Sequence, residues 1–332
     1  MRITVIGAGS WGTTISSVIA DGSEIRLWAR KSADAEQLRT GGEYRYLPGF
    51  ELPPLDATAD LADALAGADA VLVAVPSHGF RAVMVDAADF IPPTTPVVSL
   101  TKGLEEGSNL RMTQVLGEVL GHHDRRHLGV LSGPNLAREI AAGEPAATVV
   151  AVRDAATATT IQNALMRPRF RVYTNPDVVG SEIAGTAKNV MAIAAGMVNG
   201  LGFGLNTMAT MVTRSLAEVA RLGIALGGNP LTFGGLSGIG DLMATCLSTL
   251  SRNHQVGLEL AKRRPIDEIV AEMRMVAEGV KSTEPLLALA AHHGVEMPIA
   301  EEVAAVLTGG DPRDSLARLM ERAARPEGHG IV

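Results

Sequence analysis

The stretch VIGAGSWGTT, residues 5–14, decides the fold of the N-terminal half through the segments on either side of its glycines. The β-branched run RITVI at 2–6 precedes it and predicts a strand. Apolar residues at helical spacing follow over 11–21, and EIRLW at 24–28 predicts a second strand. Strand, glycine turn, helix and strand within about 30 residues are typical of a dinucleotide-binding βαβ unit, whereas a plain glycine turn lacks this context.

Each glycine of this stretch has its own expected role. Gly7 allows the tight turn, and Gly9 lets the backbone approach a pyrophosphate. Gly12 allows the helix to pack closely on the strand. The free N–H groups at the start of the helix would face the phosphates. We therefore expect Gly7, Gly9 and Gly12 to form a cofactor site.

Three further apolar runs predict buried parallel strands, at residues 70–75, 96–100 and 128–131. Polar residues follow each run, as PSH at 76–78, TKG at 101–103 and SGPN at 132–135. Ligands of open parallel sheets bind beyond the carboxyl ends of the strands. These three segments are therefore where we expect the chemistry of this half.

The end of the second strand bears on which cofactor is preferred. An NAD-selective site usually has Asp or Glu there, to bind the ribose hydroxyls. This chain instead reads WARK at 28–31, with Arg30 and Lys31 where a 2′-phosphate would lie. The pattern predicts a preference for NADP(H), with NAD(H) possible. The alternative is that the two cations belong to a solvated loop.

The second half has a different pattern. Strand signals end after residues 171–176, and helical patterns follow over 183–198, 206–226, 253–262 and 285–293. We expect an α/β Rossmann-type domain with a parallel sheet over residues 1–180. An all-helical substrate-binding and catalytic domain is expected over 181–332.

One lysine stands out in the first of these helices. Lys188 shares a helix face with Ala184, Ala192 and Ala195, in a segment that is nearly all apolar. Burial favours the neutral form of a lysine, and such a group is suited to proton transfer. The alternative is a lysine whose apolar stem is buried while its charge reaches solvent.

Two polar stretches follow in the second half. Asp241 comes after a glycine turn in an apolar setting, and Ser251-Arg252-Asn253 comes ten residues later. Arginine binds phosphate through its bidentate fork, with Ser and Asn as neutral donors. A helix cap followed by an exposed arginine is the equally supported alternative for this triplet.

Composition excludes several classes of protein. The 332 residues are 46% hydrophobic and 20% charged, with a formal charge of −7, as expected of a globular protein. Nucleic-acid binding is not expected, because no basic face dominates. We find neither a signal peptide nor an apolar run that could span a bilayer, and we expect a cytoplasmic protein without membrane insertion. The single cysteine and the scattered histidines predict no metal site.

With these residues in view, the chain resembles bacterial NAD(P)+-dependent glycerol-3-phosphate dehydrogenases from its first glycines to about residue 320. The stretches that carry the resemblance are GAGSWGT, LWAR, YLPG, VPSH, TKGLE, SGPNLAREI, GTAKNVMAIAAGM, GLGFG, TRSLAEVARLG, GIGDLMATC, LSRN and EGVKSTE. Members of this family reduce dihydroxyacetone phosphate to sn-glycerol 3-phosphate, the backbone of phospholipids. The resemblance also favours a homodimer.

The resemblance implies a role for each matching residue. Lys188 would be the catalytic acid/base. The other implied substrate contacts are Lys102, Gly133, Asn135, Asp241, Ser251, Arg252 and Asn253. The implied cofactor contacts are Ser10, Trp11, Arg30, Lys31, Lys102, Ala137, Arg252, Val276 and Glu278.

This chain departs from the family pattern in two places. Asn135 stands where Ser or Thr is usual. After GLGFG, Leu205 and Met208 replace an acidic and a basic residue, so that a local ion pair or a phosphate contact is lost, which puts substrate affinity in doubt without disturbing Lys188. Two other functions stay open: a β-hydroxyacid dehydrogenase of the 6-phosphogluconate type, and a non-catalytic NADP(H)-binding sensor.

Overall fold

The computed structural model describes residues 1–273, 277–324 and 326–327. The chain forms two compact units: Met1–Thr101 with Met112–Val178, and Lys102–Arg111 with Val179–Val332. The main division thus falls two residues before the expected boundary. The ten residues 102–111, expected in the first domain, belong instead to the second unit.

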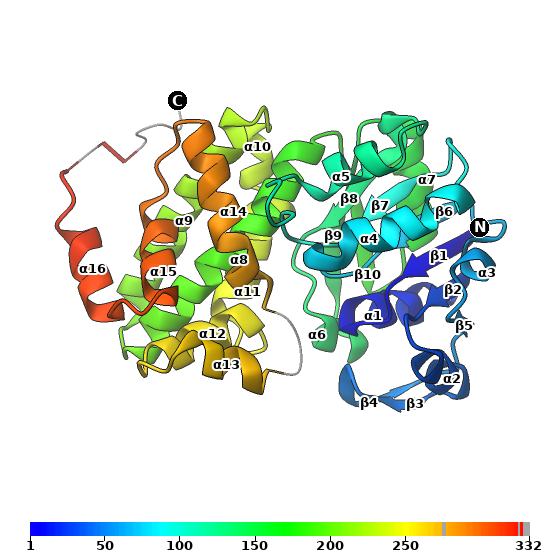
Figure 1. The fold of residues 1–332 in the computed structure, drawn as a ribbon, viewed down its shortest axis with the longest axis horizontal. Coiled ribbons are helices and arrows are strands. Elements are labelled where there is room, and N and C mark those ends of the chain that lie inside the picture. Colours follow the sequence, from blue (N-terminus) through cyan, green and yellow to red (C-terminus); the bar gives the residue numbers. More distant parts are fainter. Residues whose placement is uncertain (274–276, 325, 328–332) are drawn as a thin grey trace. The chain divides into compact units, whose positions relative to one another are not determined.

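The first unit is built on an eight-stranded sheet (Figure 1). Its strands are β1 (Arg2–Ile6), β2 (Glu24–Trp28), β5 (Ala57–Thr58), β6 (Ala70–Val73), β7 (Val97–Ser99), β8 (Leu128–Ser132), β9 (Ala146–Val152) and β10 (Phe170–Asn175). Its helices are α1 (Ser10–Ile19), α2 (Ser32–Thr40), α3 (Leu61–Leu65), α4 (Ser77–Ala87), α5 (Met112–Val119), α6 (Ala137–Ala141) and α7 (Ala155–Leu165). A separate antiparallel pair consists of β3 (Gly42–Tyr44) and β4 (Leu47–Leu52).

The strand order is β10-β9-β8-β7-β6-β1-β2-β5. The chain runs outward from β1 to β2 and β5, then returns to the other side of β1 as β6. The switch point of this doubly wound sheet therefore lies between β1 and β6, where such folds bind ligands. All pairs are parallel except β8 with β9. We had not predicted β9, whose apolar run AATVVAV pairs antiparallel with β8.

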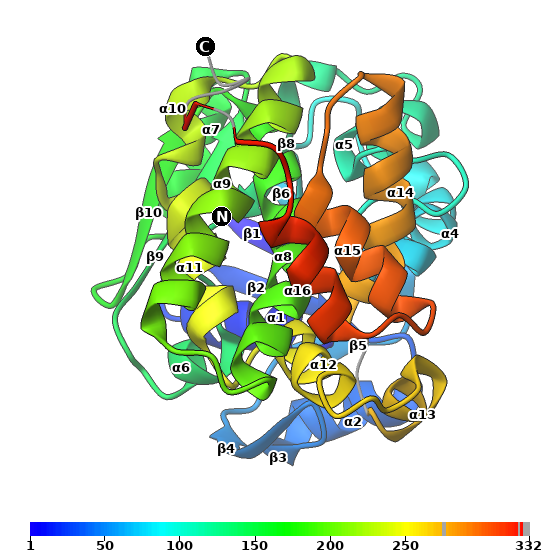
Figure 2. The same ribbon diagram turned by 90° about the vertical axis from the view of Figure 1, so that its left-hand side faces the viewer.

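The second unit is helical, and the buried helix α8 (Val178–Gly200) begins it. The others are α9 (Leu205–Ala225), α10 (Pro230–Phe233), α11 (Asp241–Leu247), α12 (Arg252–Leu260), α13 (Ile266–Glu272), α14 (Glu278–His292), α15 (Pro298–Leu307) and α16 (Pro312–Met320). Helix α16 packs against α15, as the rotated view shows (Figure 2). The prediction that the fourth helix begins at Pro285 was wrong. That helix, α14, starts seven residues earlier, and Pro285 lies in its middle rather than at its start.

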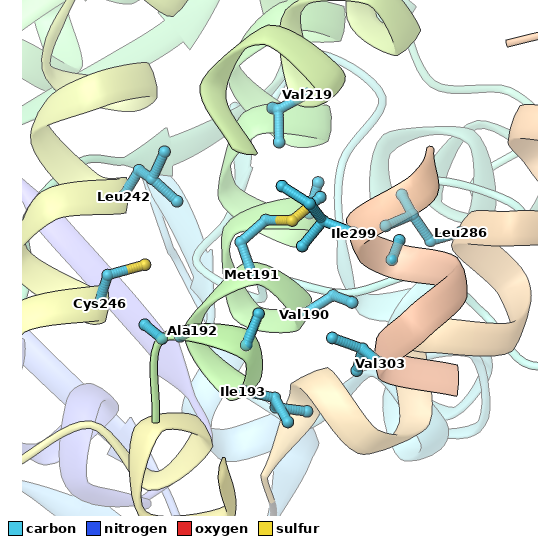
Figure 3. Close-up of a cluster of buried hydrophobic side chains, with 14 of the residues drawn as sticks. Val190, Met191, Ala192, Ile193, Val219, Leu242, Cys246, Leu286, Ile299 and Val303 are labelled. Atoms are coloured by element: carbon cyan, nitrogen blue, oxygen red, sulfur yellow. The ribbon is translucent and has the colours of Figure 1, made fainter. Parts of the chain in front are cut away.

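The core of the helical unit surrounds α8 (Figure 3). Val190, Met191, Ala192 and Ile193 are consecutive and fully buried, so α8 is covered on all sides. Leu242 and Cys246 of α11 pack against one side of the cluster, and Leu286, Ile299 and Val303 lie on the side of α14 and α15. Lys188, which lies on this helix, is only 7% exposed.

Close backbone contact brings α12 against α8. A Cβ atom on Gly257 would lie 2.0 Å from the carbonyl oxygen of Ile193, and one on Gly196 would lie 2.0 Å from that of His254. Only glycine fits at both positions. The crossing places the first turn of α12 beside the part of α8 that carries Lys188 and Asn189, as the hydrogen bond from Asn253 to Asn189 shows.

Among the described residues, no helix is both long and apolar enough to cross a membrane.

Candidate active site

The glycine loop of the first unit has the shape of a pyrophosphate cradle. Gly7 has φ of 115°, and a Cβ on Gly12 would lie 1.9 Å from the carbonyl oxygen of Gly7. A Cβ on Gly9 would instead point into open space, the side from which a ligand can approach the backbone. The first-turn N–H groups of α1 have no acceptor within the helix. The residues present therefore fit a dinucleotide phosphate.

The small β3–β4 sheet supports this loop. The Tyr44 hydroxyl donates to the carbonyl oxygen of Ala8 at 2.8 Å, and Ser10 Oγ donates to that of Tyr46 at 2.6 Å. Tyr44 is buried. The glycine loop is thus held in place before any ligand binds.

The other predicted cofactor residues of the first unit lie near the ends of its strands. Arg30 and Lys31 follow β2 and are exposed, and Lys31 directly precedes α2 without a capping hydrogen bond from its side chain. Ala137 begins α6, and its carbonyl oxygen accepts from Thr14 of α1 at 3.4 Å. The indole Nε1 of Trp11 is buried with no acceptor among the described residues. Val276 lies outside the described residues.

Two predicted substrate residues follow β8 in the first unit. Gly133 has φ of 134°, which favours glycine. The Asn135 amide donates to Thr148 Oγ1 at 3.0 Å, while its Oδ1 is buried and accepts no hydrogen bond from the described part of the chain. Asn135 thus offers an amide oxygen as acceptor, where Ser or Thr would offer a hydroxyl group.

The helical unit brings two predicted lysines together on one carboxylate. Lys188 Nζ donates to Asp241 Oδ1 and Lys102 Nζ donates to Asp241 Oδ2, both at 2.6 Å. Asp241 is 1% exposed, and the lysine side chains are 9% and 16% exposed. Asp241 follows a π-helical turn at residues 236–240 and begins α11, where the helix dipole favours a carboxylate.

Within this Lys102–Asp241–Lys188 cluster, burial changes the pKa of Lys102. It lowers the pKa of Lys102 to about 8. The negative charge of Asp241 raises the pKa and so opposes part of the effect, while the positive charge of Lys188 lowers it further. Lys102 therefore changes charge close to physiological pH.

Sequence reasoning missed two residues that orient the lysines. Thr245 Oγ1 accepts from Lys188 Nζ at 2.6 Å and donates to the carbonyl oxygen of Asp241 at 2.7 Å. Asn189 Nδ2 donates to the carbonyl oxygen of Lys102 at 3.0 Å. Their positions, four residues after Asp241 and next to Lys188, were the only available signals.

Asn253 is tied into the same network. Its Nδ2 donates to Asn189 Oδ1 at 3.0 Å, and its Oδ1 accepts from the N–H of Gly279 at 2.9 Å. A chain of hydrogen bonds thus runs from α14 through α12 and α8 to Lys102. Asn253 was predicted to bind substrate. In the structure its side chain also links α14 to Asn189 of α8.

The other members of the Ser-Arg-Asn triplet show the cap arrangement. Ser251 Oγ accepts from the N–H of His254 at 3.3 Å and caps α12, and Arg252 is exposed in the first turn. An exposed arginine at the start of a nine-residue helix is also placed to receive an anion. Glu278 begins α14 and interacts electrostatically with Arg252.

The family-pattern departures after GLGFG have different surroundings. Met208 is buried in the core of the helical unit, so it replaces a basic side chain with apolar packing. Leu205 is 85% exposed at the first position of α9, and nothing in the structure explains it.

The histidines make structural contacts. His123 is buried with its ring nitrogens 2.7 Å from the carbonyl oxygen of Thr95 and 3.1 Å from that of Asp124. His127 Nδ1 lies 2.7 Å from Thr157 Oγ1. Within residues 1–273, 277–324 and 326–327, no group of three or more His, Cys, Asp or Glu is placed to hold a metal ion.

A doubly wound sheet with a glycine cradle, joined in one chain to a buried lysine–carboxylate–lysine cluster, defines a nucleotide-dependent dehydrogenase. Comparison with known proteins gives the family. The model of the NAD-dependent glycerol-3-phosphate dehydrogenase N-terminus matches residues 2–158, and that of the C-terminus matches residues 177–318. The chain belongs to the NAD-dependent glycerol-3-phosphate dehydrogenase family.

Individual relatives are similar over nearly the whole chain. Glycerol-3-phosphate dehydrogenase (NAD(P)+) 2 of Sphingopyxis alaskensis is 52% identical, over 93% of this chain and 92% of that protein. The Thermobifida fusca glycerol-3-phosphate dehydrogenase (NAD(P)+) is 48% identical over 99% of both. The crystal structure of glycerol-3-phosphate dehydrogenase from Coxiella burnetii superimposes with a TM-score of 0.91 at 36% identity, covering 97% of this chain and 99% of that one.

Proposed function

We propose that this chain reduces dihydroxyacetone phosphate to sn-glycerol 3-phosphate with NADPH or NADH, a reversible reaction that supplies the glycerophospholipid backbone. The observation that carries the proposal is the pair of lysines on Asp241, one buried and one half-buried, in a chain of this family. Reduction of a ketone creates negative charge on its oxygen, and two adjacent ammonium groups are suited to receive it.

Lys188 is the proposed general acid. Two of the three N–H bonds of its ammonium group are directed at Asp241 and Thr245, which leaves one for the carbonyl oxygen of a substrate. The nicotinamide, when bound, supplies the hydride to the carbonyl carbon. Lys188 then gives its proton to the oxygen, and Lys102 stabilises the developing charge.

The remaining predicted contacts hold the substrate phosphate and the cofactor. Arg252 binds the phosphate, aided by Ser251 and Asn253 at the start of α12. Gly133 and Asn135 complete the proposed substrate contacts. The proposed cofactor contacts are Gly7, Gly9, Ser10, Trp11, Gly12, Arg30, Lys31, Lys102, Ala137, Arg252, Val276 and Glu278.

The proposal predicts how the rate depends on pH. Because the pKa of Lys102 is about 8, its stabilising charge is present below that pH and is lost as pH rises through it. We expect the initial-rate kcat/KM for ketone reduction to fall by about tenfold per unit well above pH 8. Lys102→Met should give a low rate without this limb. A wild-type limb centred near pH 10, or a limb that survives in Lys102→Met, would contradict the assignment.

The charges after β2 predict a preference for NADPH. In the Arg30→Ala/Lys31→Ala variant we expect KM for NADPH to rise by about 10- to 100-fold, because charged hydrogen bonds to the 2′-phosphate are lost. KM for NADH should change by less than about threefold. Arg39→Ala, an exposed cation in the last turn of α2, is the control. Equal increases for both cofactors would refute the preference.

We also propose a homodimer through the helical unit. Its support is the set of exposed large apolar side chains there, which includes Leu205, Leu231 and Met320. Sedimentation at micromolar concentration would distinguish the dimer from a monomer. A cytoplasmic location stays a prediction from the sequence.

The function itself is tested by following NADPH oxidation with dihydroxyacetone phosphate, and NADP+ reduction with 6-phosphogluconate as the competing assay. We expect turnover with the first substrate only. A folded protein that binds NADPH but turns over neither would favour the sensor alternative. Turnover with 6-phosphogluconate would favour the β-hydroxyacid dehydrogenase.

A further inference from the structure

The segment Lys102–Arg111, which we call the strap, joins β7 to α5 in the sequence but belongs to the helical unit. It forms a short hairpin. Leu104 and Arg111 pair as an antiparallel bridge, and the N–H of Glu105 donates to the carbonyl oxygen of Leu110 at 2.9 Å. Arg111 therefore lies opposite Leu104, and Leu104 is two residues after Lys102 in the sequence.

Besides the hydrogen bond from Lys102 to Asp241, contacts at both ends of the strap hold it on the helical unit. Leu104 is 2% exposed within the core around α8. Asn189 donates to the backbone carbonyl of Lys102. At the C-terminal end of the strap, the Arg111 guanidinium donates to the carboxylate of Glu182 on α8. These two side chains are only 14% and 5% exposed.

This ion pair is largely shielded from water, so removing one of its partners is costly. If Arg111 is replaced, the strap loses this contact with α8. If Glu182 is replaced, the Arg111 charge stays on the strap without its partner, and the strap has to shift for that charge to regain water. A second ion pair on the strap contrasts with it. Glu106 lies 4.0 Å from Lys281, and both side chains are more than half exposed, so little depends on that pair.

We propose that the Arg111–Glu182 ion pair is a positioning device for Lys102. The ion pair fixes Arg111 on α8. Because Arg111 is paired with Leu104 across the hairpin, it also fixes the first residues of the strap, and with them Lys102 on Asp241. Arg111 and Glu182 act through Lys102, so the inference rests on the proposed role of that lysine. Without the pair, the strap loosens and Lys102 Nζ leaves the cluster.

The test is a double-mutant cycle between Arg111→Met and Lys102→Met, read as kcat for reduction of dihydroxyacetone phosphate. Alone, Arg111→Met should lower kcat by about tenfold or more, since small displacements of a catalytic group cost that much. In the Lys102→Met background it should have no further effect, because the group it positions is absent. Arg111→Lys should restore part of the rate.

KM for NADPH should rise by less than about threefold in Arg111→Met, because the proposed phosphate contacts, in the glycine cradle and at the end of β2, lie in the other unit. Glu106→Gln is the matched control on the same strap and should keep the wild-type kcat. If Arg111→Met does not fold, Glu182→Gln keeps the size and an acceptor oxygen and enters the same cycle.

Two results would overturn the inference. An equal fall in kcat in both backgrounds would mean that Arg111 supports the fold rather than Lys102, and a folded Arg111→Met enzyme with wild-type kcat would mean that the pair is dispensable. A wild-type kcat in Lys102→Met alone would refute the role of Lys102 itself, and is thereby distinguishable from a failure of the strap.

Discussion

Replacing Lys188 by alanine is expected to lower kcat for dihydroxyacetone phosphate reduction by about 10³-fold or more. The variant loses the proton donor, which by itself contributes about 10²- to 10⁴-fold, and one of the two charges that stabilise the oxyanion. NADPH should still bind, since its proposed phosphate contacts come from the glycine loop and the β2 end. Stopped-flow measurement of hydride transfer, with NADPH fluorescence as the binding readout, checks both expectations.

The control for this variant is Lys262→Ala, a lysine 62% exposed at the end of α12. It should keep the wild-type rate. A Lys188→Ala enzyme that retains more than about a tenth of the rate would transfer the acid role to another group, and Lys102 would be the first candidate. Loss of NADPH binding in the variant would mean that the fold, not the chemistry, had been damaged.

Replacing Asp241 by asparagine is expected to affect stability and rate together. The size is kept, but two lysines lose their shared counter-charge, and breaking a buried ion pair costs about 3 kcal/mol or more in the free energy of unfolding. We also expect kcat to fall by about 10²-fold, because neither ammonium group is then held in one orientation. Urea denaturation and steady-state kinetics give the two quantities.

This loss of stability should depend on pH in a defined direction. The charge of Asp241 raises the pKa of Lys102, so removing it leaves the folded-state pKa further below the unfolded value of about 10.4. Between these two values the unfolded chain binds more protons than the folded one, and stability therefore increases with pH. Above pH 8 the wild type gains stability in parallel, because its Lys102 pKa is about 8, so the variant should recover part of its lost stability as the pH rises toward 8.

Glu259→Gln supplies a matched comparison. Glu259 also accepts from two cations, Lys262 and Arg264, but it lies on the surface of α12, 29% exposed. Its loss should cost about 1 kcal/mol or less. Equal costs for the two variants would show that burial is not what makes the Asp241 cluster important.

The elements that could be predicted are those whose cause is local. β1 and β2 have the predicted bounds, because a β-branched run beside a glycine turn has few alternatives. The burial of Lys188 was predicted from the spacing of alanines on one helix face, and it is confirmed. The prediction that a helix starts at Pro285 was wrong, because Pro285 is the eighth of the 15 residues of α14 and its missing N–H does not end this helix.

The site could be predicted residue by residue but not as an arrangement. Lys102 was assigned to the first domain by its place after a sheet strand, whereas hydrogen bonds and the buried Leu104 hold its segment on the helical unit. Asn189 and Thr245 were missed because the sequence of a helix does not indicate which distant residue a polar side chain contacts. Ser251 is a helix cap, which its sequence pattern had left open.

By itself, the sequence determined that the chain has a nucleotide-binding βαβ unit, a helical second half and a buried lysine, because steric limits on glycine and apolar periodicity act over a few residues. Only the tertiary structure decided that Lys102 and Lys188 share Asp241. Those contacts join residues 139 and 53 positions apart. They exist because α11 and the strap both pack against α8, and no short-range pattern encodes that packing.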